Sequence, residues 1–128
     1  MLVSLNREND MTDEQTFIDS YIETAIWSST DDTGEPLDKR FDAGDLSEDA
    51  INTINRDCKQ FIKLNEPVLD NLDYAQCGHD FWLTRNGHGA GFWDGDYEEK
   101  TGEYLTQASK DAGTSDLYIA DDGKLWIF

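Results

Sequence analysis

Basic residues are scarce in this sequence. The 128-residue chain has 10 Lys and Arg against 28 Asp and Glu, which gives a formal net charge of -18. Proteins that bind nucleic acid directly use clustered Lys and Arg to displace counterions from phosphates. No such cluster exists here, so neither direct binding to nucleic acid nor binding to an anionic membrane surface is expected. If charge selects the partner, that partner presents a basic surface.

Long apolar runs and cysteines are also few. No run approaches the roughly 20 apolar residues that span a bilayer, and the N-terminus lacks the basic start and apolar core of a secretory signal. The sequence therefore predicts a cytoplasmic protein. Cys58 and Cys77 allow one disulfide at most, and we expect two buried, reduced thiols. No metal-ligand spacing such as His-Glu-x-x-His or paired Cys-x-x-Cys occurs, so no metal or other cofactor is predicted.

Apolar residues are nevertheless plentiful enough for a fold. Hydrophobic residues make up 38% of the chain and aromatic residues 12%, which is enough burial to offset chain entropy. The length is close to the commonest size of a single domain. We expect residues 1–11 to be a loose N-terminal leader and residues 12–128 to form one α+β domain.

Two helices are predicted in the N-terminal half. Thr12 and Gln15 match a capping box, and apolar residues then recur at three- and four-residue spacing over 17–26. A long acidic loop begins at Ser28. The second helix is expected to start at Ser47 and to end before Pro67, because proline disfavours helical backbone in the residue that precedes it.

Two β-hairpins and a third helix are predicted in the C-terminal half. The first hairpin is indicated by Asn86-Gly87, which lies between the aromatic runs 80–84 and 90–93. The second is indicated by an Asp-Gly turn at 121–123, which lies between apolar runs. Helical spacing over 97–112, followed by Gly113, predicts a helix between them. The expected fold is α+β: two helices, a hairpin, a helix and a hairpin, with the strands in a small antiparallel sheet that the helices cover.

The block over 79–94 reads HDFWLTRNGHGAGFWD. It resembles a block found in small uncharacterised proteins of bacteriophages and mobile elements. The resemblance extends to 26–32 upstream and to 116–118 and 121–123 downstream, so it covers most of residues 16–126. It implies a phage origin, and with it a location in the host cytoplasm, and it brings no catalytic residues.

Five residues of this block have the side chains of acid–base and metal sites: His79, Asp80, Arg85, His88 and Asp94. A small enzyme that uses this cluster is one alternative function, and it requires the five to surround a concave site. For Arg85, a salt bridge to Asp80 or Asp94 within the hairpin is favoured over anion binding. No nucleophile elbow, phosphate-binding loop or dinucleotide fingerprint occurs, so the main prediction is not an enzyme.

Ten acidic residues and no Lys or Arg lie between Glu8 and Asp38. Eight of them are predicted to bind the partner: Asp13, Glu14, Asp19, Glu23, Asp31, Asp32, Glu35 and Asp38. An ordered array of carboxylates can imitate the phosphates of nucleic acid. The main prediction is therefore an inhibitor or modulator of a host nucleic-acid-binding protein, a DNA mimic of anti-restriction or anti-CRISPR type.

Acidic residues also serve purposes that need no partner, because carboxylates keep a protein soluble or adapt it to high salt. Residues 1–64 hold 15 acidic and 6 basic residues, and residues 65–128 hold 13 and 4, so each half has a net charge of -9. This even distribution counts against a role for the acidic residues that is confined to the segment between Glu8 and Asp38. A phage structural or other interaction protein is a further alternative function. Exposed tryptophans would also suit a homodimer.

Overall fold

The protein is mostly helical. The computed structural model describes residues 12–88, 90–94 and 97–127, so the predicted leader lies outside the described residues. The helices are α2 (Asp13–Ser28), α3 (Glu48–Leu69), α4 (Tyr74–Arg85) and α5 (Glu99–Asp111), with 3-10 turns η1 (Leu37–Lys39), η2 (Ala43–Asp45) and η3 (Phe92–Asp94). The strands β1 (Leu117–Ile119) and β2 (Leu125–Ile127) form a two-stranded antiparallel hairpin. The predicted α+β fold with two hairpins is therefore wrong.

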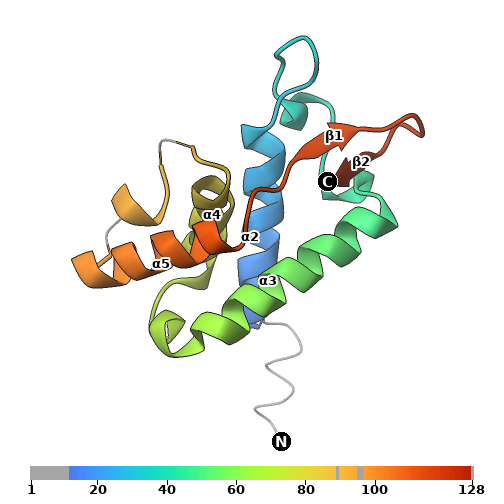
Figure 1. Ribbon diagram of the computed structural model, residues 1–128. Helices are drawn as coiled ribbons and strands as arrows, with labels where there is room; N and C mark the ends of the chain where they lie inside the picture. Colours follow the sequence, from blue (N-terminus) through green and yellow to red (C-terminus); the bar gives the residue numbers. More distant parts are fainter. Residues whose placement is uncertain (1–11, 89, 95–96, 128) are drawn as a thin grey trace, which may run out of the picture.

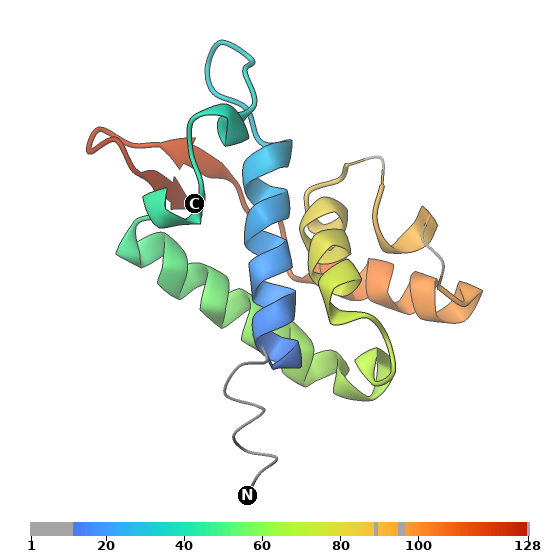
Figure 2. The same cartoon turned by 180° about the vertical axis from the view of Figure 1, so that it is seen from behind.

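Helix α2 occupies the centre of the molecule (Figure 1; Figure 2). Helix α4 packs along it, and α3 and α5 cross this pair. The two central helices approach closely because residue 78 of α4 is glycine, and a Cβ there would overlap the backbone carbonyl of Phe17. The hairpin lies beside the start of α3, where Ser47 N donates to Leu125 O at 2.8 Å. The small sheet thus seals one end of a helical core.

Helix α2 begins where the sequence predicts. Thr12 Oγ1 accepts a hydrogen bond from Gln15 N at 3.0 Å, and the Gln15 side chain donates to Asp19 at 2.7 Å. The predicted apolar stripe faces the core and its buried members are Phe17, Ile18, Tyr21, Ala25 and Ile26. Local capping and periodicity were sufficient to place this helix.

An aromatic cluster joins α2, α3 and α4 in the core. Phe61 of α3 stacks on Phe81 of α4 with ring centroids 4.0 Å apart. Tyr21 of α2 meets Trp82 of α4 edge to face at 5.3 Å. Such pairs contribute roughly 0.5–1.5 kcal/mol beyond the burial of their area. The cluster therefore fixes the mutual positions of the three helices.

The first predicted hairpin is replaced by the end of α4. Gly87 has φ +73°, its N–H donates to Thr84 O at 3.2 Å, and His88 N donates to Leu83 O at 3.0 Å. This pair of bonds is a Schellman motif, which needs a glycine of positive φ just as a type I′ hairpin turn does. The residues from Phe81 to Arg85 are all buried, so this helix has five consecutive buried residues, polar ones included, in place of an apolar stripe.

Helix α3 continues through Pro67 to Leu69, but it consists of two helical segments, and the break between them lies just before Pro67, where the sequence predicts the end of the helix. The backbone of Asn65 leaves helical geometry, with φ -118° and ψ 16°, and the helix is kinked there. The terminal hairpin is confirmed, with Tyr118 opposite Trp126. Cys58 and Cys77 are buried and free, as predicted. Within the described part of the chain, no helix combines the length and apolar character needed to cross a membrane.

Candidate functional site

One face of α2 borders a groove whose other wall is the segment that carries η1 and η2, seen beside α2 in Figure 2. The groove has a volume of about 550 Å³, within the range of roughly 300–1,000 Å³ that is usual for ligand pockets. We call it the α2 groove. Its lining residues are Asp19, Ile22, Glu23, Ile26, Trp27, Asp38, Phe41, Asp42 and Ala43.

The floor of the α2 groove is apolar. Ile26 is buried, and Ile22 and Phe41 are half-buried against the core. Trp27, in contrast, is 46% exposed. The five lining residues of α2 recur at helical spacing over 19–27, and they lie on the side of the helix that Phe17, Tyr21 and Ala25 do not use. Ile22 and Ile26, at the edge of the stripe that faces the core, thus also form part of the groove floor.

The rim of the α2 groove is acidic. Asp19 and Glu23 of α2 and Asp38 and Asp42 of the opposite wall are exposed, and no Lys or Arg is among the lining residues. Three of the eight predicted partner-binding residues, Asp19, Glu23 and Asp38, are therefore brought together here. Like charges at this density disfavour one another and attract a cation.

Asp31 and Asp32 line a different and larger cleft, of about 1170 Å³, between the 28–33 loop and β1. Asp31 is occupied inside its own loop: it accepts from Thr33 N at 2.8 Å and from Glu35 N at 3.0 Å, and it pairs with Arg40 at 3.1 Å. The hydrogen bonds from Thr33 and Glu35 lower the pKa of Asp31 to about 2. This carboxylate shapes the loop and is not available to a partner.

The remaining predicted partner residues are dispersed. Asp13 and Glu14 are exposed in the first turn of α2, where carboxylates favour the helix dipole. Glu35 forms an exposed salt bridge with Lys39 at 3.8 Å. The acidic segment therefore divides into a groove rim, a structured loop and a helix start.

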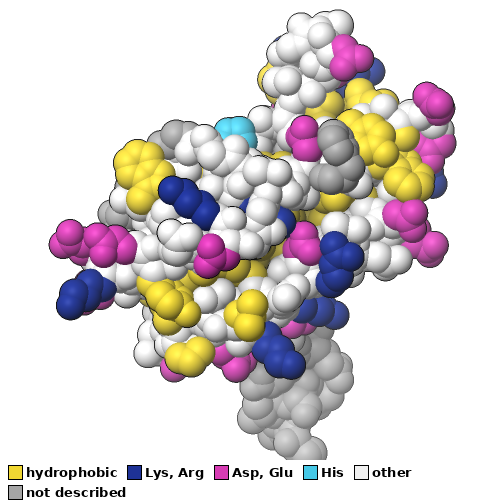
Figure 3. Space-filling model, viewed as in Figure 1, with side chains coloured by type: hydrophobic (Ala, Val, Ile, Leu, Met, Phe, Trp, Pro, Cys, Tyr) yellow, Lys and Arg dark blue, Asp and Glu magenta, His cyan; other side chains and the backbone are white. Residues whose placement is uncertain are grey.

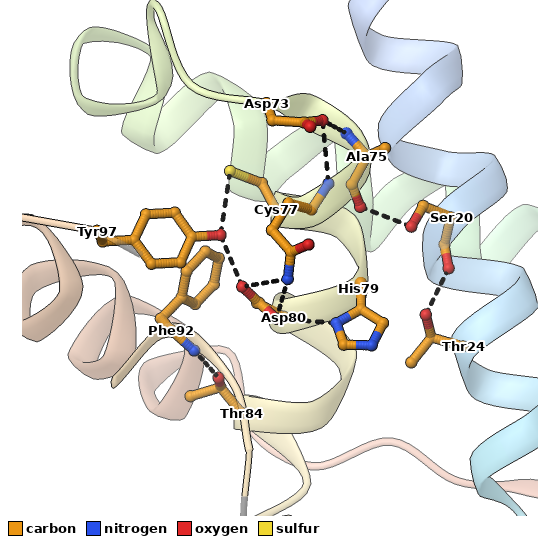
Figure 4. Close-up of polar contacts among 11 residues, drawn as sticks. Ser20, Thr24, Asp73, Ala75, Cys77, His79, Asp80, Thr84, Phe92 and Tyr97 are labelled. Carbon is orange, nitrogen blue, oxygen red and sulfur yellow. Dashed lines mark hydrogen bonds and ion pairs between the residues drawn. The ribbon is translucent and has the colours of Figure 1, made fainter. Parts of the chain in front are cut away.

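His79 and Asp80 form a pair at the junction of α4 with the segment after η3 (Figure 4). Asp80 is only 2% exposed. It accepts from Tyr97 Oη at 2.6 Å and from Gln76 Nε2 at 3.0 and 3.1 Å, and His79 Nδ1 lies 2.8 Å from it. Several donors thus satisfy this buried carboxylate, as burial requires.

Tyr97 and Cys77, beside Asp80, hold their protons. Burial, and then the hydrogen bond to Asp80, raise the pKa of Tyr97 well above its usual range. Burial likewise raises the pKa of Cys77 to about 11, and Tyr97 Oη lies 3.9 Å from its Sγ. At neutral pH the cluster therefore presents a neutral phenol and a thiol. Neither is an activated nucleophile.

Arg85 is buried on the other side of α4. It donates to Asp57 Oδ2 and to Tyr21 Oη, each at 3.0 Å, and to the carbonyl oxygens of Ala112 and Gly113 at 3.1 and 2.7 Å. It thereby caps the C-terminus of α5, where a cation is favoured. The predicted pairing with Asp80 or Asp94 is not the one observed, because Asp57 of α3 supplies the counter-charge.

The alternative site does not assemble as the sequence suggested. His79 and Asp80 touch each other, Arg85 points to α3 and α5, and His88 lines the larger cleft. Asp94 belongs to η3, and its side chain lies outside the described residues. Among the residues that the structure describes, no group of three or more His, Cys, Asp or Glu side chains is placed to hold a metal ion.

Sequence reasoning missed the residues that complete both sites. Trp27 and Phe41 line the α2 groove, and no motif in the sequence singles out either residue. Tyr97 reaches Asp80 from 17 residues away, which no local pattern indicates. Gln76 and Asp80 lie four residues apart, so their contact follows once residues 74–85 are known to be helical.

Comparisons with protein-family models, with curated proteins and with solved structures found no match for this chain. The resemblance of the 79–94 block to phage proteins therefore stays a prediction, and function has to be inferred from the site.

Proposed function

We propose that this protein binds a basic surface of a host nucleic-acid-binding protein and blocks its access to nucleic acid. The observation that carries the proposal is the α2 groove, where carboxylates from two separate segments meet around an apolar floor without a Lys or Arg in the lining. A groove that binds nucleic acid has the opposite charge. Electrostatic complementarity of this kind speeds encounter and selects basic partners.

The phage-like sequence block supports the choice of partner. A phage that enters a cell meets restriction and CRISPR enzymes, and these have basic grooves for DNA or RNA. The protein would act by occupying such a groove in the host cytoplasm. Carboxylates at Asp19, Glu23, Asp38 and Asp42 would take the places of phosphates, and no nucleic acid would be bound directly.

Competition measurements test this function. The purified protein is used to capture partners from host lysate, and each captured nucleic-acid-binding protein is titrated with labelled duplex DNA in the presence and absence of the protein. We expect DNA to be displaced, and the protein–protein complex to weaken steeply as salt is raised. The double variant Asp19→Asn with Glu23→Gln should displace DNA at least about tenfold less well.

The matched control is the double variant Glu99→Gln with Glu103→Gln. It removes two exposed carboxylates from α5, outside the α2 groove, and changes the net charge equally. It should displace DNA as well as the unaltered protein does. Binding that is insensitive to salt, or equal losses in both double variants, would show that the α2 groove is not the binding site.

A further inference from the structure

The α2 groove has features that charge imitation alone does not need. A surface that only replaces phosphates requires carboxylates, whereas this groove has an apolar floor of Ile22, Ile26 and Phe41 and a half-exposed Trp27. Exposed aromatic side chains within a concave surface are the usual anchors of protein interfaces. The rim and the floor together therefore describe a more specific partner than a basic surface.

We infer that the α2 groove receives a segment of the partner in which one or more large apolar side chains are flanked by Lys or Arg. This inference rests on the proposed function and narrows it to one chemical class of ligand. The apolar side chain would lie on the floor against Trp27 and Phe41. The flanking cations would meet Asp19 and Glu23 on one wall and Asp38 and Asp42 on the other.

Charge complementarity selects this occupant. All four charged residues of the lining are carboxylates, so an acidic or neutral segment would leave the rim without a counter-charge. Arg40, which precedes Phe41 in the chain, is committed to Asp31, and its guanidinium lies 5.1 Å from the centroid of the Phe41 ring. A cation of this chain thus already lies over the Phe41 ring, so the cations of a partner are expected to meet the four carboxylates of the rim.

Trp27 is held in place for such contacts. Its ring lies 6.0 Å from the ring of His79, at an interplanar angle of 34°. His79 is in turn bonded to the buried Asp80, which Tyr97 and Gln76 fix. The Asp80 cluster therefore buttresses the exposed tryptophan of the groove. Such preorganisation lowers the entropic cost of binding.

Two synthetic peptides test the inference. In the first, leucines recur at helical spacing among lysines, and in the second, serines replace the leucines. Binding of the labelled peptides to the full chain is followed by fluorescence anisotropy at several salt concentrations. We expect both peptides to bind more weakly as salt is raised, because salt screens the contacts of their lysines with the carboxylates. The leucine peptide should bind at least about tenfold more tightly than the serine peptide at every salt concentration, because the apolar contacts of its leucines are not screened. Equal binding of the two peptides would overturn the inference.

Two tryptophan variants locate the binding site. Trp27→Ala should weaken binding of the leucine peptide by at least about tenfold, as the loss of an interface hot spot does. It should leave the weaker binding of the serine peptide unchanged. Trp93→Ala is the matched control, because Trp93 is 60% exposed and lies in η3, outside the groove lining. Circular dichroism confirms folding of each variant. Unchanged binding of the leucine peptide by Trp27→Ala, or equal losses in both variants, would overturn the inference. If Trp27→Ala does not fold, the comparison of the two peptides on the unaltered chain still tests the inference.

Failure of the inference and failure of the proposed function give different results. If the leucine peptide binds through Trp27 but no nucleic-acid-binding protein is inhibited, the proposed function is wrong and the ligand class of the groove stands. If a captured enzyme is inhibited equally well by Trp27→Ala, the function stands, and the inferred apolar anchor is wrong.

Discussion

Two grooves of similar size lie on different sides of the molecule. The α2 groove has a volume of about 550 Å³, and a groove between α3 and α5 has about 510 Å³. Both present exposed apolar side chains, Trp27 in the first and Leu64 and Tyr104 in the second. In Figure 3, hydrophobic side chains lie over α3 and α5 with both Lys/Arg and Asp/Glu around them. The two grooves therefore differ in charge and not in size or in the presence of apolar surface.

The difference is explained by where the charges are used. The charged lining residues of the α3–α5 groove are Asp57, Arg85 and Asp111, and Arg85 is paired with Asp57. In the α2 groove the carboxylates are on the rim and no cation lines it. The two halves of the sequence have equal net charge, yet the linings of the two grooves differ: the charged residues of the α2 groove are all carboxylates, whereas those of the α3–α5 groove include Arg85. In the α3–α5 groove the Arg85–Asp57 pair joins two helices, whereas in the α2 groove, among the described residues, Asp19 and Asp42 accept hydrogen bonds only from their own segments, from Gln15 Nε2 and Gly44 N.

Arg85→Met tests the structural half of this comparison and should have the largest effect. It removes the buried partner of Asp57, which keeps only the exposed Arg56, and it removes the cap of α5, so the free energy of unfolding should fall by about 3–5 kcal/mol. Urea denaturation measures the loss. Arg56→Met is the control, because the Arg56 side chain is 69% exposed and its pair with Asp57 is a surface one. That variant should change stability by less than about 1 kcal/mol, and a similar loss in both would contradict the structural role of Arg85.

Tyr97→Phe asks whether the buttress behind the α2 groove contributes to stability. It removes the 2.6 Å hydrogen bond to the buried Asp80. Loss of a donor to a buried charged group costs roughly 1.5–3 kcal/mol. Tyr104→Phe is the matched control, since Tyr104 is half exposed in the α3–α5 groove. Equal shifts of the denaturation curve in both tyrosine variants would show that the hydrogen bond between Tyr97 and Asp80 does not contribute to stability.

Glu23→Lys tests the half of the comparison that concerns binding. A cation in the rim repels the cations of a basic ligand, so binding of the leucine peptide should weaken by about tenfold or more, or roughly 1.4 kcal/mol. Glu103→Lys places the same reversal on α5, outside the α2 groove, and should leave anisotropy titrations within error of the unaltered chain. An equal loss for both reversals would mean that net charge, and not the α2 groove, governs binding.

Acid titration of Asp31 should give the smallest effect and sharpens the distinction between structural and free carboxylates. The pKa of Asp31 is about 2 in the folded chain against an ordinary value of 3.8, so its contribution to stability is present above pH 4 and is lost as pH falls towards 2. Thermal unfolding between pH 5 and 2, compared with Asp31→Asn, isolates this component. The variant should lose less stability over that interval, and identical pH profiles would show that Asp31 does not shape the loop.

Helix α4 shows why the fold was only partly predictable. Its residues from Phe81 to Arg85 are buried by contacts with α2, α3, η3 and α5, polar Thr84 and Arg85 included, so they show no alternation of buried and exposed positions from which helical periodicity can be recognised. The glycine that follows satisfies a helix C-cap and a hairpin turn equally well. The C-terminal hairpin, by comparison, was predictable, because its short apolar runs flank an Asp-Gly turn.

The sequence predicted that the candidate site is acidic, but it did not predict where in the fold the site lies. Asp19 and Glu23 lie one helical turn apart, so their common face follows from the sequence once α2 is recognised. Asp38, Asp42 and Phe41 reach the same groove only because the loop folds back along α2 through η1 and η2. Nothing in the composition of that loop indicates this return.

The sequence by itself determined the start of α2, its apolar stripe, the terminal hairpin and the shortage of cations, because capping, periodicity, turn chemistry and charge are properties of neighbouring residues. The tertiary structure alone decided that residues 74–85 are a helix, that Arg85 pairs with Asp57 and that four of the carboxylates surround an apolar groove. These depend on burial and on contacts between residues far apart in the chain. Such contacts override local preference when packing contributes more than propensity does.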